Sequence, residues 1–263
     1  MATKAAPILE RILESRRAAI AALKASGAEA GLPESVAAAP APRDFRQALR
    51  GTGVALIAEC KERSPSGGLL QRPYDPVRLA RRYVASGAAA ISVLTEPEFF
   101  GGNLDHLQAV RAAVDVPVLC KDFIIDPIQV LTARAVGADA VLLIVGVLDD
   151  AALRDLQALA TRLSMRAVVE VHSEEEVDRA LRAEASVIGI NNRDLTTMKT
   201  DRGTTIRLRP LIPAGRVVIS ESGIESRADV DELRRCGVDA VLVGESLLRA
   251  ADLEAKVGEL SGR

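Results

Sequence analysis

The 263-residue sequence contains no tryptophan, and its only aromatic residues are two tyrosines and four phenylalanines. A core with so few rings must be built from alanine, valine, leucine and isoleucine. This composition is typical of buried parallel strands covered by alanine-rich helices, and it argues against an aromatic-rich β-sandwich. The length suits one large barrel as a single domain.

Long hydrophobic runs and a strong excess of one charge are also missing. No segment approaches the roughly 18 consecutive apolar residues of a transmembrane helix. The formal net charge is −2 and the isoelectric point is about 5.9, whereas a nucleic-acid-binding surface would be strongly basic. We therefore expect a small-molecule partner, with no binding to nucleic acid or to a membrane.

Cysteine is scarce, and its spacing indicates no disulfide framework. Cys60, Cys120 and Cys236 lie far apart and form no CxxC motif, which fits buried, reduced thiols in a cytoplasmic protein. Glu10 and Glu14 lie among the arginines of the N-terminal segment, where a signal or transit peptide would avoid acids. We expect an amphipathic helix there, and a cytoplasmic location.

Short apolar runs rich in valine and isoleucine recur from residue 54 onward. They begin roughly 26 residues apart on average, which is typical of a repeated strand–helix unit. An open doubly wound sheet would usually carry a glycine-rich fingerprint after its first strand, and none is present. The sequence therefore predicts an α/β fold, a (β/α)8 TIM barrel over residues 51–263 preceded by an N-terminal helical extension over residues 1–50. The runs begin at residues 54, 89, 116, 138, 166, 186, 216 and 239.

Helix start and stop signals lie between most of these runs. Asp75 and Asp126 are each followed by proline and predict helix N-caps, and Ser173 is followed by acids that favour the positive end of a helix dipole. Gly237 is one of several glycines that end such a stretch. The proline- and alanine-rich stretch over residues 31–45 instead predicts a loop.

Charged or amide side chains stand at the ends of five of the eight runs. Residues two apart in a strand face the same side, so Glu59 and Lys61 should point together. Active sites of barrels gather at the carboxyl ends of the strands, and a buried charge is costly unless it is paired. We interpret these side chains as one polar cluster at the barrel mouth rather than as the starts of separate solvated loops. The other members are Lys121, Glu170, Asn191, Arg193 and Glu221.

Two glycine turns near the end of the chain indicate an anion site. Ser222 and Gly223 follow the seventh run, and Gly244 and Glu245 follow the eighth. Glycine lets backbone N–H groups approach an anion, and the loops after strands seven and eight are the usual phosphate site of such barrels. Each turn alone fits an ordinary left-handed turn, but the two together are stronger evidence for an anion site. The SPSGG loop at residues 64–68 would cover the ligand.

The two histidines carry less information. His106 is expected on a helix, and His172 follows Glu170 by two residues. We interpret both as structural. The sequence has no HxH, ExxH or Cys/His cluster, so no metal site is predicted.

Seven motifs, in order from about residue 54 to about residue 250, resemble those of the indole-3-glycerol phosphate synthase family. Related phosphate-binding barrels share the two glycine turns but not ECKxxSPS, KDF and INNR together. The N-terminal helix and the proline-rich segment are similar to the extension that precedes the barrel in that family. The motifs are IAECKERSPSGG, ISVLTEPEFFGG, PVLCKDFIIDPIQV, VVEVHSEEEVDRAL, IGINNRDL, VISESGI and VLVGESLL.

The resemblance implies a carbon–carbon lyase of tryptophan biosynthesis, specifically a carboxy-lyase. In that family, 1-(2-carboxyphenylamino)-1-deoxyribulose 5-phosphate closes to indole-3-glycerol phosphate with loss of CO2 and water, without cofactor or metal. The implied partner is this small phosphorylated substrate. We expect a monomer, with other enzymes of the tryptophan pathway as candidate contacts.

The resemblance also implies roles for the residues at matching positions. Lys121 of the KDF motif is the implied general acid, and Glu170 its acid–base partner. Lys61 is implied to bind the anthranilate carboxylate, with Glu59 orienting it. Asn191 is implied to hold a substrate hydroxyl.

Further positions are implied to bind the substrate. Arg193 would contribute positive charge, and Glu221 would keep the cluster near neutral. A lysine acts best as an acid near neutral pH when its pKa is lowered, and the convergence of Lys61, Lys121 and Arg193 predicts such lowering. The residues implied around the phosphate are Ser64, Ser222, Gly223, Gly244 and Glu245, the last mainly through its backbone N–H.

Phenylalanines and two departures from the family pattern complete the expected site. Phe99 and Phe123 lie in the loops after the second and third runs, where the benzene ring of the substrate needs an apolar surface. Glu62 and Arg63 stand where the family more often has a basic or small pair. The charge of Glu245 is unfavourable beside a phosphate unless its side chain points outward.

Two alternative functions differ in their requirements. A phosphoribosylanthranilate-type isomerase would more naturally use a carboxylate together with a cysteine or a second aspartate. A non-catalytic phosphosugar-binding barrel would leave the polar ends of five strands unexplained.

Overall fold

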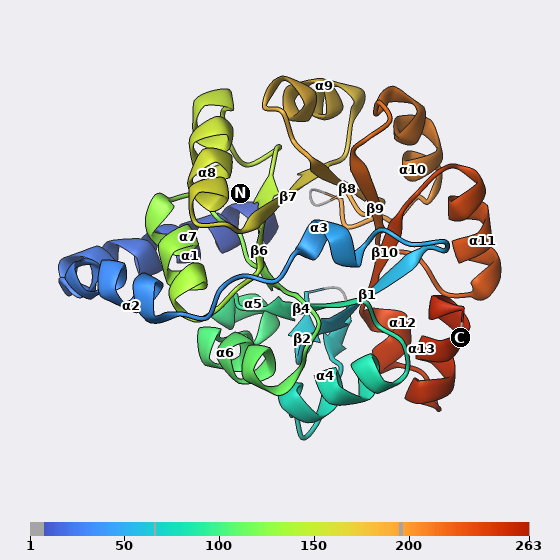
Figure 1. The fold of residues 1–263 in the computed structure, drawn as a ribbon, viewed down its shortest axis with the longest axis horizontal. Coiled ribbons are helices and arrows are strands. Elements are labelled where there is room, and N and C mark those ends of the chain that lie inside the picture. Colours follow the sequence, from blue (N-terminus) through green and yellow to red (C-terminus); the bar gives the residue numbers. More distant parts are fainter. Residues whose placement is uncertain (1–7, 66, 195–196, 263) are drawn as a thin grey trace, which may run out of the picture.

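The computed structural model describes residues 8–65, 67–194 and 197–262, which leaves Ser66 of the SPSGG loop and Leu195 of the IGINNRDL motif outside the described residues. Eight parallel strands close into a barrel with the neighbour order β1-β10-β9-β8-β7-β6-β5-β4 (Figure 1). The predicted (β/α)8 barrel is confirmed, and every strand begins within two residues of its predicted start. The strands are β1 (Ala55–Cys60), β4 (Ala90–Leu94), β5 (Val118–Lys121), β6 (Ala140–Ile144), β7 (Arg166–Val171), β8 (Val187–Asn191), β9 (Val217–Glu221) and β10 (Ala240–Val243).

Helices cover the outside of the barrel and begin at the predicted caps. The carboxylate of Asp75 accepts a hydrogen bond from the backbone N–H of Arg78, and Asp126 forms a capping box with Gln129. Ser173 accepts one from the N–H of Glu176. The outer helices are α4 (Pro76–Ala85), α6 (Leu104–Ala113), α7 (Pro127–Ala135), α8 (Asp150–Arg162), α9 (Glu174–Arg182), α10 (Gly203–Leu208), η2 (Arg209–Leu211), α11 (Arg227–Arg235) and α13 (Leu253–Ser261).

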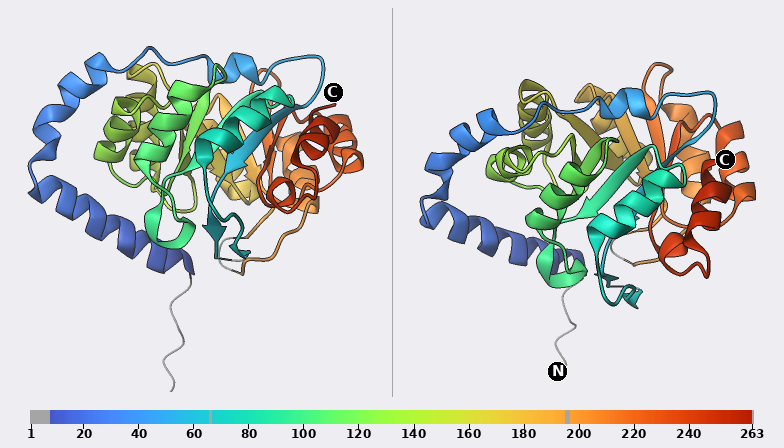
Figure 2. Two further views of the ribbon diagram at one scale, coloured as in Figure 1. Left: turned by 90° about the horizontal axis from the view of Figure 1, so that it is seen from below. Right: turned by 60° about the horizontal axis from the view of Figure 1, so that its bottom comes forward.

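The N-terminal segment runs along one side of the barrel from its mouth to its floor. Figure 2 shows α1 (Ile8–Ala25) at the end where the strands finish, then η1 (Ala28–Gly31) and α2 (Leu32–Ala38) along the side, and α3 (Phe45–Ala48) at the opposite end. The prediction of a loop over residues 31–45 is wrong for α2. Its proline occupies the first turn, where a helix tolerates it, and its buried Leu32 packs against α7.

The core is aliphatic on both sides of the barrel wall. Outward-facing strand residues pack against the helices, and inward-facing ones, such as Ile57 and Leu119, fill the barrel. Phe45 and Leu49 are fully buried at the floor, where they close the barrel below β1. Because the floor is sealed by apolar side chains, the polar ends of the strands are confined to the mouth.

Short elements after three strands shape the mouth. A hairpin of β2 (Arg63–Ser64) and β3 (Gly68–Leu69) follows β1, α5 (Pro97–Phe100) follows β4, and α12 (Glu245–Leu248) follows β10. No helix in the described part of the chain has both the length and the apolar character needed to cross a membrane.

Candidate active site

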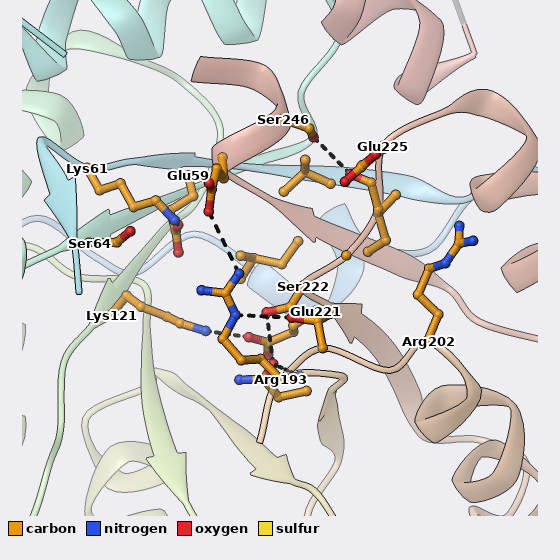
Figure 3. A pocket seen from close by; sticks show the side chains of 18 of the residues that line it. Glu59, Lys61, Ser64, Lys121, Arg193, Arg202, Glu221, Ser222, Glu225 and Ser246 are labelled. Carbon is orange, nitrogen blue, oxygen red and sulfur yellow. Dashed lines mark hydrogen bonds and ion pairs between the residues drawn. The ribbon is translucent and has the colours of Figure 1, made fainter. Parts of the chain in front are cut away.

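A cavity of about 1190 Å³ opens at the carboxyl ends of the barrel strands. Figure 3 shows polar side chains from β1, β5 and β9 directed into it. Of the site residues expected from the sequence, all but Phe99 line this cavity. They are Glu59, Lys61, Ser64, Lys121, Phe123, Glu170, Asn191, Arg193, Glu221, Ser222, Gly223, Gly244 and Glu245.

Lys121, at the end of β5, lies between two carboxylates. Its ammonium contacts Glu221 of β9 and lies 3.4 Å from Oε2 of Glu170 on β7. Glu170 and Glu221 are only 2% and 1% exposed, so each depends on the cation to offset its loss of water. Gly189 of β8 makes room for this arrangement, because a Cβ there would collide with Oε1 of Glu221.

These charges shift the proton affinities of the cluster. Burial alone would lower the pKa of Lys121, but the carboxylates, Glu221 and Glu170 foremost, hold it above its ordinary value. Burial raises the pKa of Glu221 to about 7. Burial opposes ionisation of Glu170 too, but Lys121 and His172 keep its pKa below the ordinary value. The expected lowering of the lysine pKa by neighbouring cations is wrong, because carboxylates are the nearest charges to Lys121.

The end of β1 supplies a second ion pair. Nζ of Lys61 lies 2.6 Å from Oε1 of Glu59, so the predicted orientation of the two side chains to one side of the strand is confirmed. Gly244, at the end of the neighbouring strand β10, permits their position. A Cβ on Gly244 would collide with Oε1 of Glu59 and lie 3.0 Å from Nζ of Lys61.

Asn191 connects the ends of β8 and β9. Its side-chain oxygen accepts hydrogen bonds from Oγ of Ser222 at 2.9 Å and from the backbone N–H of Arg193 at 3.0 Å. Ser222 and Gly223 both adopt the left-handed region, with φ of 67° and 74°. Because that region is uncommon for a residue other than glycine, the hydrogen bond to Asn191 helps to hold the serine in this turn.

The rim between β10 and the β2–β3 hairpin is polar and nearly charge-balanced. The carboxylate of Glu245 pairs with Arg193 at 3.7 Å and with Arg249 at 2.9 Å, so its negative charge is offset on two sides. Oγ of Ser64 accepts a hydrogen bond from the backbone N–H of Gly67 at 2.9 Å. This rim therefore combines hydroxyl, backbone and guanidinium groups around one end of the cavity.

The sequence interpretation missed three cations of the lining: Arg202, Arg249 and Lys256. Of these, Arg202 forms an ion pair with Asp229, a contact between residues far apart in the chain that no local pattern signals. Arg249 was detectable, because it lies four residues after Glu245 at the start of a helix, the spacing of a helical ion pair.

One phenylalanine of the expected apolar wall lies elsewhere. Phe100, not Phe99, lines the cavity, and its ring centroid lies 6.1 Å from that of Phe123. Phe99 instead lies beneath Arg11, whose guanidinium carbon is 5.2 Å from the centroid of the Phe99 ring. Successive residues in the helical turn α5 point in different directions, so only one of the two rings faces the mouth.

His172, interpreted from the sequence as structural, lies outside the cavity lining and next to Glu170 of the polar cluster. Its Nε2 lies 3.4 Å from Oε1 of Glu170, and its Nδ1 lies 3.2 Å from Oε2 of Glu176. The two-residue spacing from Glu170 was a usable signal, because residues two apart at the end of a strand point to the same side.

The thiols take no part in the cluster. Cys60 and Cys120 are buried, and burial raises the pKa of the Cys120 thiol to about 12 and that of Cys60 further. Over the described ranges, no group of three or more His, Cys, Asp and Glu side chains is placed to hold a metal ion. Lys121 and its neighbouring carboxylates can exchange protons with a molecule bound in the cavity.

The fold and the site define a (β/α)8-barrel protein whose mouth brings a lysine–carboxylate cluster beside a polar rim. The model of the indole-3-glycerol phosphate synthase family matches residues 9–260. The chain belongs to this family.

Individual relatives agree over nearly the whole length. An indole-3-glycerol phosphate synthase of Roseiflexus sp. is 49% identical over 264 residues, which cover 97% of this chain and 98% of the relative. Indole-3-glycerol phosphate synthase 2 of Streptomyces coelicolor is 52% identical over 234 residues, covering 89% and 91%. Among solved structures, 3-hexulose-6-phosphate synthase from Salmonella typhimurium matches with a TM-score of 0.67 at 18% identity, over 80% of this chain and 97% of that one. That last likeness concerns the fold alone.

Proposed function

We propose that the protein is a carboxy-lyase of tryptophan biosynthesis that converts 1-(2-carboxyphenylamino)-1-deoxyribulose 5-phosphate to indole-3-glycerol phosphate, CO2 and water. The observation that carries this proposal is the ammonium of Lys121 held 3.4 Å from the buried carboxylate of Glu170 at the barrel mouth. Such a pair supplies an acid and a base within reach of one bound molecule.

The acid in this proposal is Lys121. Because its pKa lies above the ordinary value, it carries its proton at neutral pH. It would protonate the sugar carbonyl as the aryl carbon attacks and would then regain a proton from solvent. The restored ammonium would protonate the hydroxyl, which leaves as water. Glu170 stays ionised because its pKa is lowered. It would stabilise the cationic intermediate and accept the proton released as the indole double bond forms.

The residues that line the cavity would bind different parts of the substrate. Lys61, oriented by Glu59, would bind the anthranilate carboxylate until it leaves as CO2, and Asn191 would hold a sugar hydroxyl. The aromatic ring would lie against Phe100 and Phe123. The residues proposed at the phosphate are Ser64, Ser222, Gly223, Gly244, the backbone of Glu245, and Arg193 for positive charge.

We also propose that the enzyme is a cytoplasmic monomer whose partner is this small phosphorylated substrate. The three free cysteines, two of them buried, suit a reducing compartment. Sedimentation of the purified protein with and without other enzymes of the tryptophan pathway tests the monomer.

The deciding experiment is turnover by the purified protein in a chelator, followed by the fluorescence of the indole product. We expect product formation with release of one CO2 for each indole ring. A phosphoribosylanthranilate-type isomerase would instead produce this substrate and release no CO2. Binding of the substrate to folded protein without product would overturn the proposal in favour of a phosphosugar-binding barrel.

A further inference from the structure

Behind the candidate active site, two polar atoms face each other and lack other partners. Oε1 of Glu170 and Nε2 of His172 are both buried and have no hydrogen-bond partner in the described part of the chain within normal geometric limits. They lie 3.4 Å apart. Since unpartnered buried polar groups are costly, a small adjustment that joins these two atoms would satisfy both.

The far side of the imidazole is anchored to helix α9. Oε2 of Glu176 lies 3.2 Å from Nδ1 of His172 and accepts the backbone N–H of the same residue at 2.6 Å. Gly146, just after β6, makes room for this carboxylate, because a Cβ there would lie 2.8 Å from its Oε1. The carboxylate of Glu176 therefore holds His172 at both its backbone and its ring.

The imidazole thus lies between two carboxylates. A neutral imidazole has one N–H and can donate to only one of them, whereas an imidazolium donates to both. The charged groups facing His172 are Glu170 of β7, Glu176 of α9 and, at longer range, Glu221 of β9. Burial opposes its charge, but these carboxylates raise the pKa of His172 above its ordinary value.

The second carboxylate oxygen of Glu170, Oε2, faces Lys121 at the mouth of the barrel. It lies 3.4 Å from Nζ of Lys121, and the nearby amide of Asn191 on β8 also helps to lower the pKa of Glu170. His172 does not line the cavity, so it reaches the substrate only through Glu170. With Oε1 free, the carboxylate would rotate about its last bond.

We propose that His172, anchored by Glu176, is a positioning residue that holds Glu170 by donating from Nε2 to Oε1, so that Oε2 stays directed at Lys121 and the substrate. The inference rests on the proposed function, since it assigns Glu170 to the reaction. It adds a chain of three side chains from α9 to the mouth, Glu176, His172 and Glu170.

The test compares His172→Leu, His172→Gln and the wild type by single-turnover rate and KM. Loss of a charge-assisted hydrogen bond to Glu170 should slow the chemical step about ten- to a hundredfold in His172→Leu. KM should stay within about twofold, because the residue does not touch the substrate. Glutamine retains a donor at the Nε2 position, so His172→Gln should lose less than about fivefold.

The pH profile gives a readout that a purely structural role would not move. The positive charge of His172 helps to keep Glu170 ionised, so both variants should shift the acidic midpoint of the single-turnover rate to higher pH. Lys121 still faces Glu170 in each variant and limits the size of the shift. An unmoved midpoint would overturn the inference.

A matched pair on helix α9 keeps the test decisive even where His172→Leu does not fold. Glu176→Gln removes the charge that anchors the imidazole and should slow turnover severalfold, whereas Glu175→Gln, an exposed neighbour, should leave it unchanged. Equal rates for these two variants, or equal losses for leucine and glutamine at position 172, would contradict the role of His172. An inactive wild type would instead contradict the proposed function.

Discussion

Arg16 of the N-terminal helix α1 pairs with Asp122, the residue that follows Lys121, with Nε and Oδ1 3.1 Å apart. Asp122 is 5% exposed and also accepts hydrogen bonds from Oγ1 of Thr95 and from the backbone N–H of Phe123, both at 2.8 Å. The extension outside the barrel therefore helps to fix the segment that carries the proposed general acid.

Arg16→Ala should destabilise the protein by about 1–3 kcal/mol, because the buried carboxylate of Asp122 loses one of its partners. Burial already raises the pKa of Asp122, against the effect of Arg16. Without Arg16 that pKa rises further, so the folded state binds a proton that the unfolded state does not. The destabilisation should then be larger at pH 7 than at pH 4.5.

Urea unfolding of Arg16→Ala at both pH values checks this expectation, with the exposed neighbour Arg17→Ala as control. Equal stability of Arg16→Ala and Arg17→Ala at pH 7 would mean that the ion pair contributes nothing.

Lys121→Ala should reduce turnover by about 10²–10⁴-fold, the contribution typical of one acid–base group. Alanine leaves the buried carboxylates of Glu170 and Glu221 without their cation, so the variant should be less stable than wild type. The fold should persist, because Glu221, whose pKa burial already raises to about 7, can take up a proton. Circular dichroism and calorimetry with inorganic phosphate should resemble those of the wild type. The exposed Lys199→Ala is the control, and turnover of Lys121→Ala at the rate of that control would remove Lys121 from the reaction.

The two neighbouring phenylalanines should differ in their effect on substrate binding. Phe100→Ala removes a ring from the cavity wall and should raise KM about tenfold, while Phe99→Ala, whose ring lies beneath Arg11, should change KM less than about twofold. Steady-state kinetics on both variants measures the difference. A larger rise of KM in Phe99→Ala than in Phe100→Ala would contradict the assignment of Phe100 to the wall that binds the aromatic ring.

Glu221 makes stability depend on pH in a predictable direction. Its pKa of about 7 in the folded protein exceeds the ordinary value of 4.5, so the folded state binds more protons between these values and loses stability as pH rises through them. Glu221→Gln lacks this group, so its stability relative to wild type should improve from pH 4.5 to pH 7.5.

Denaturant unfolding across that range measures the trend for Glu221→Gln, with Glu175→Gln as a control that should run parallel to wild type. A relative stability of Glu221→Gln that falls with rising pH would reverse the assigned shift.

Local patterns in the sequence were sufficient for the architecture. Apolar runs at regular spacing and caps such as Asp75 and Asp126 act over a few residues, and the strands and helices followed them closely. Helix α2 was missed because the prolines of residues 31–45 were interpreted as marks of a loop. Its stability comes from packing Leu32 on α7, a contact that local composition does not contain.

The sequence predicted which residues form the candidate site, but it did not predict the contacts among their charges. Strand ends in a closed barrel must meet, so Lys121, Glu170 and Glu221 could be grouped from the order of the runs alone. Which charge lies nearest to which depends on distances of a few ångströms across the barrel, so the direction of the lysine pKa was beyond the sequence. The link from Glu170 through His172 to α9 depends on tertiary contacts in the same way.

Gly189 sits on β8 beside Glu221 and contributes no atom to the chemistry, yet a single added methyl group there would displace that carboxylate. Mutational scanning under selection for tryptophan synthesis should therefore find position 189 intolerant of substitution, as if it were a catalytic residue. Position 189 of the buried strand should then vary as little as the reacting residues, because any side chain there would occupy the space of the Glu221 carboxylate.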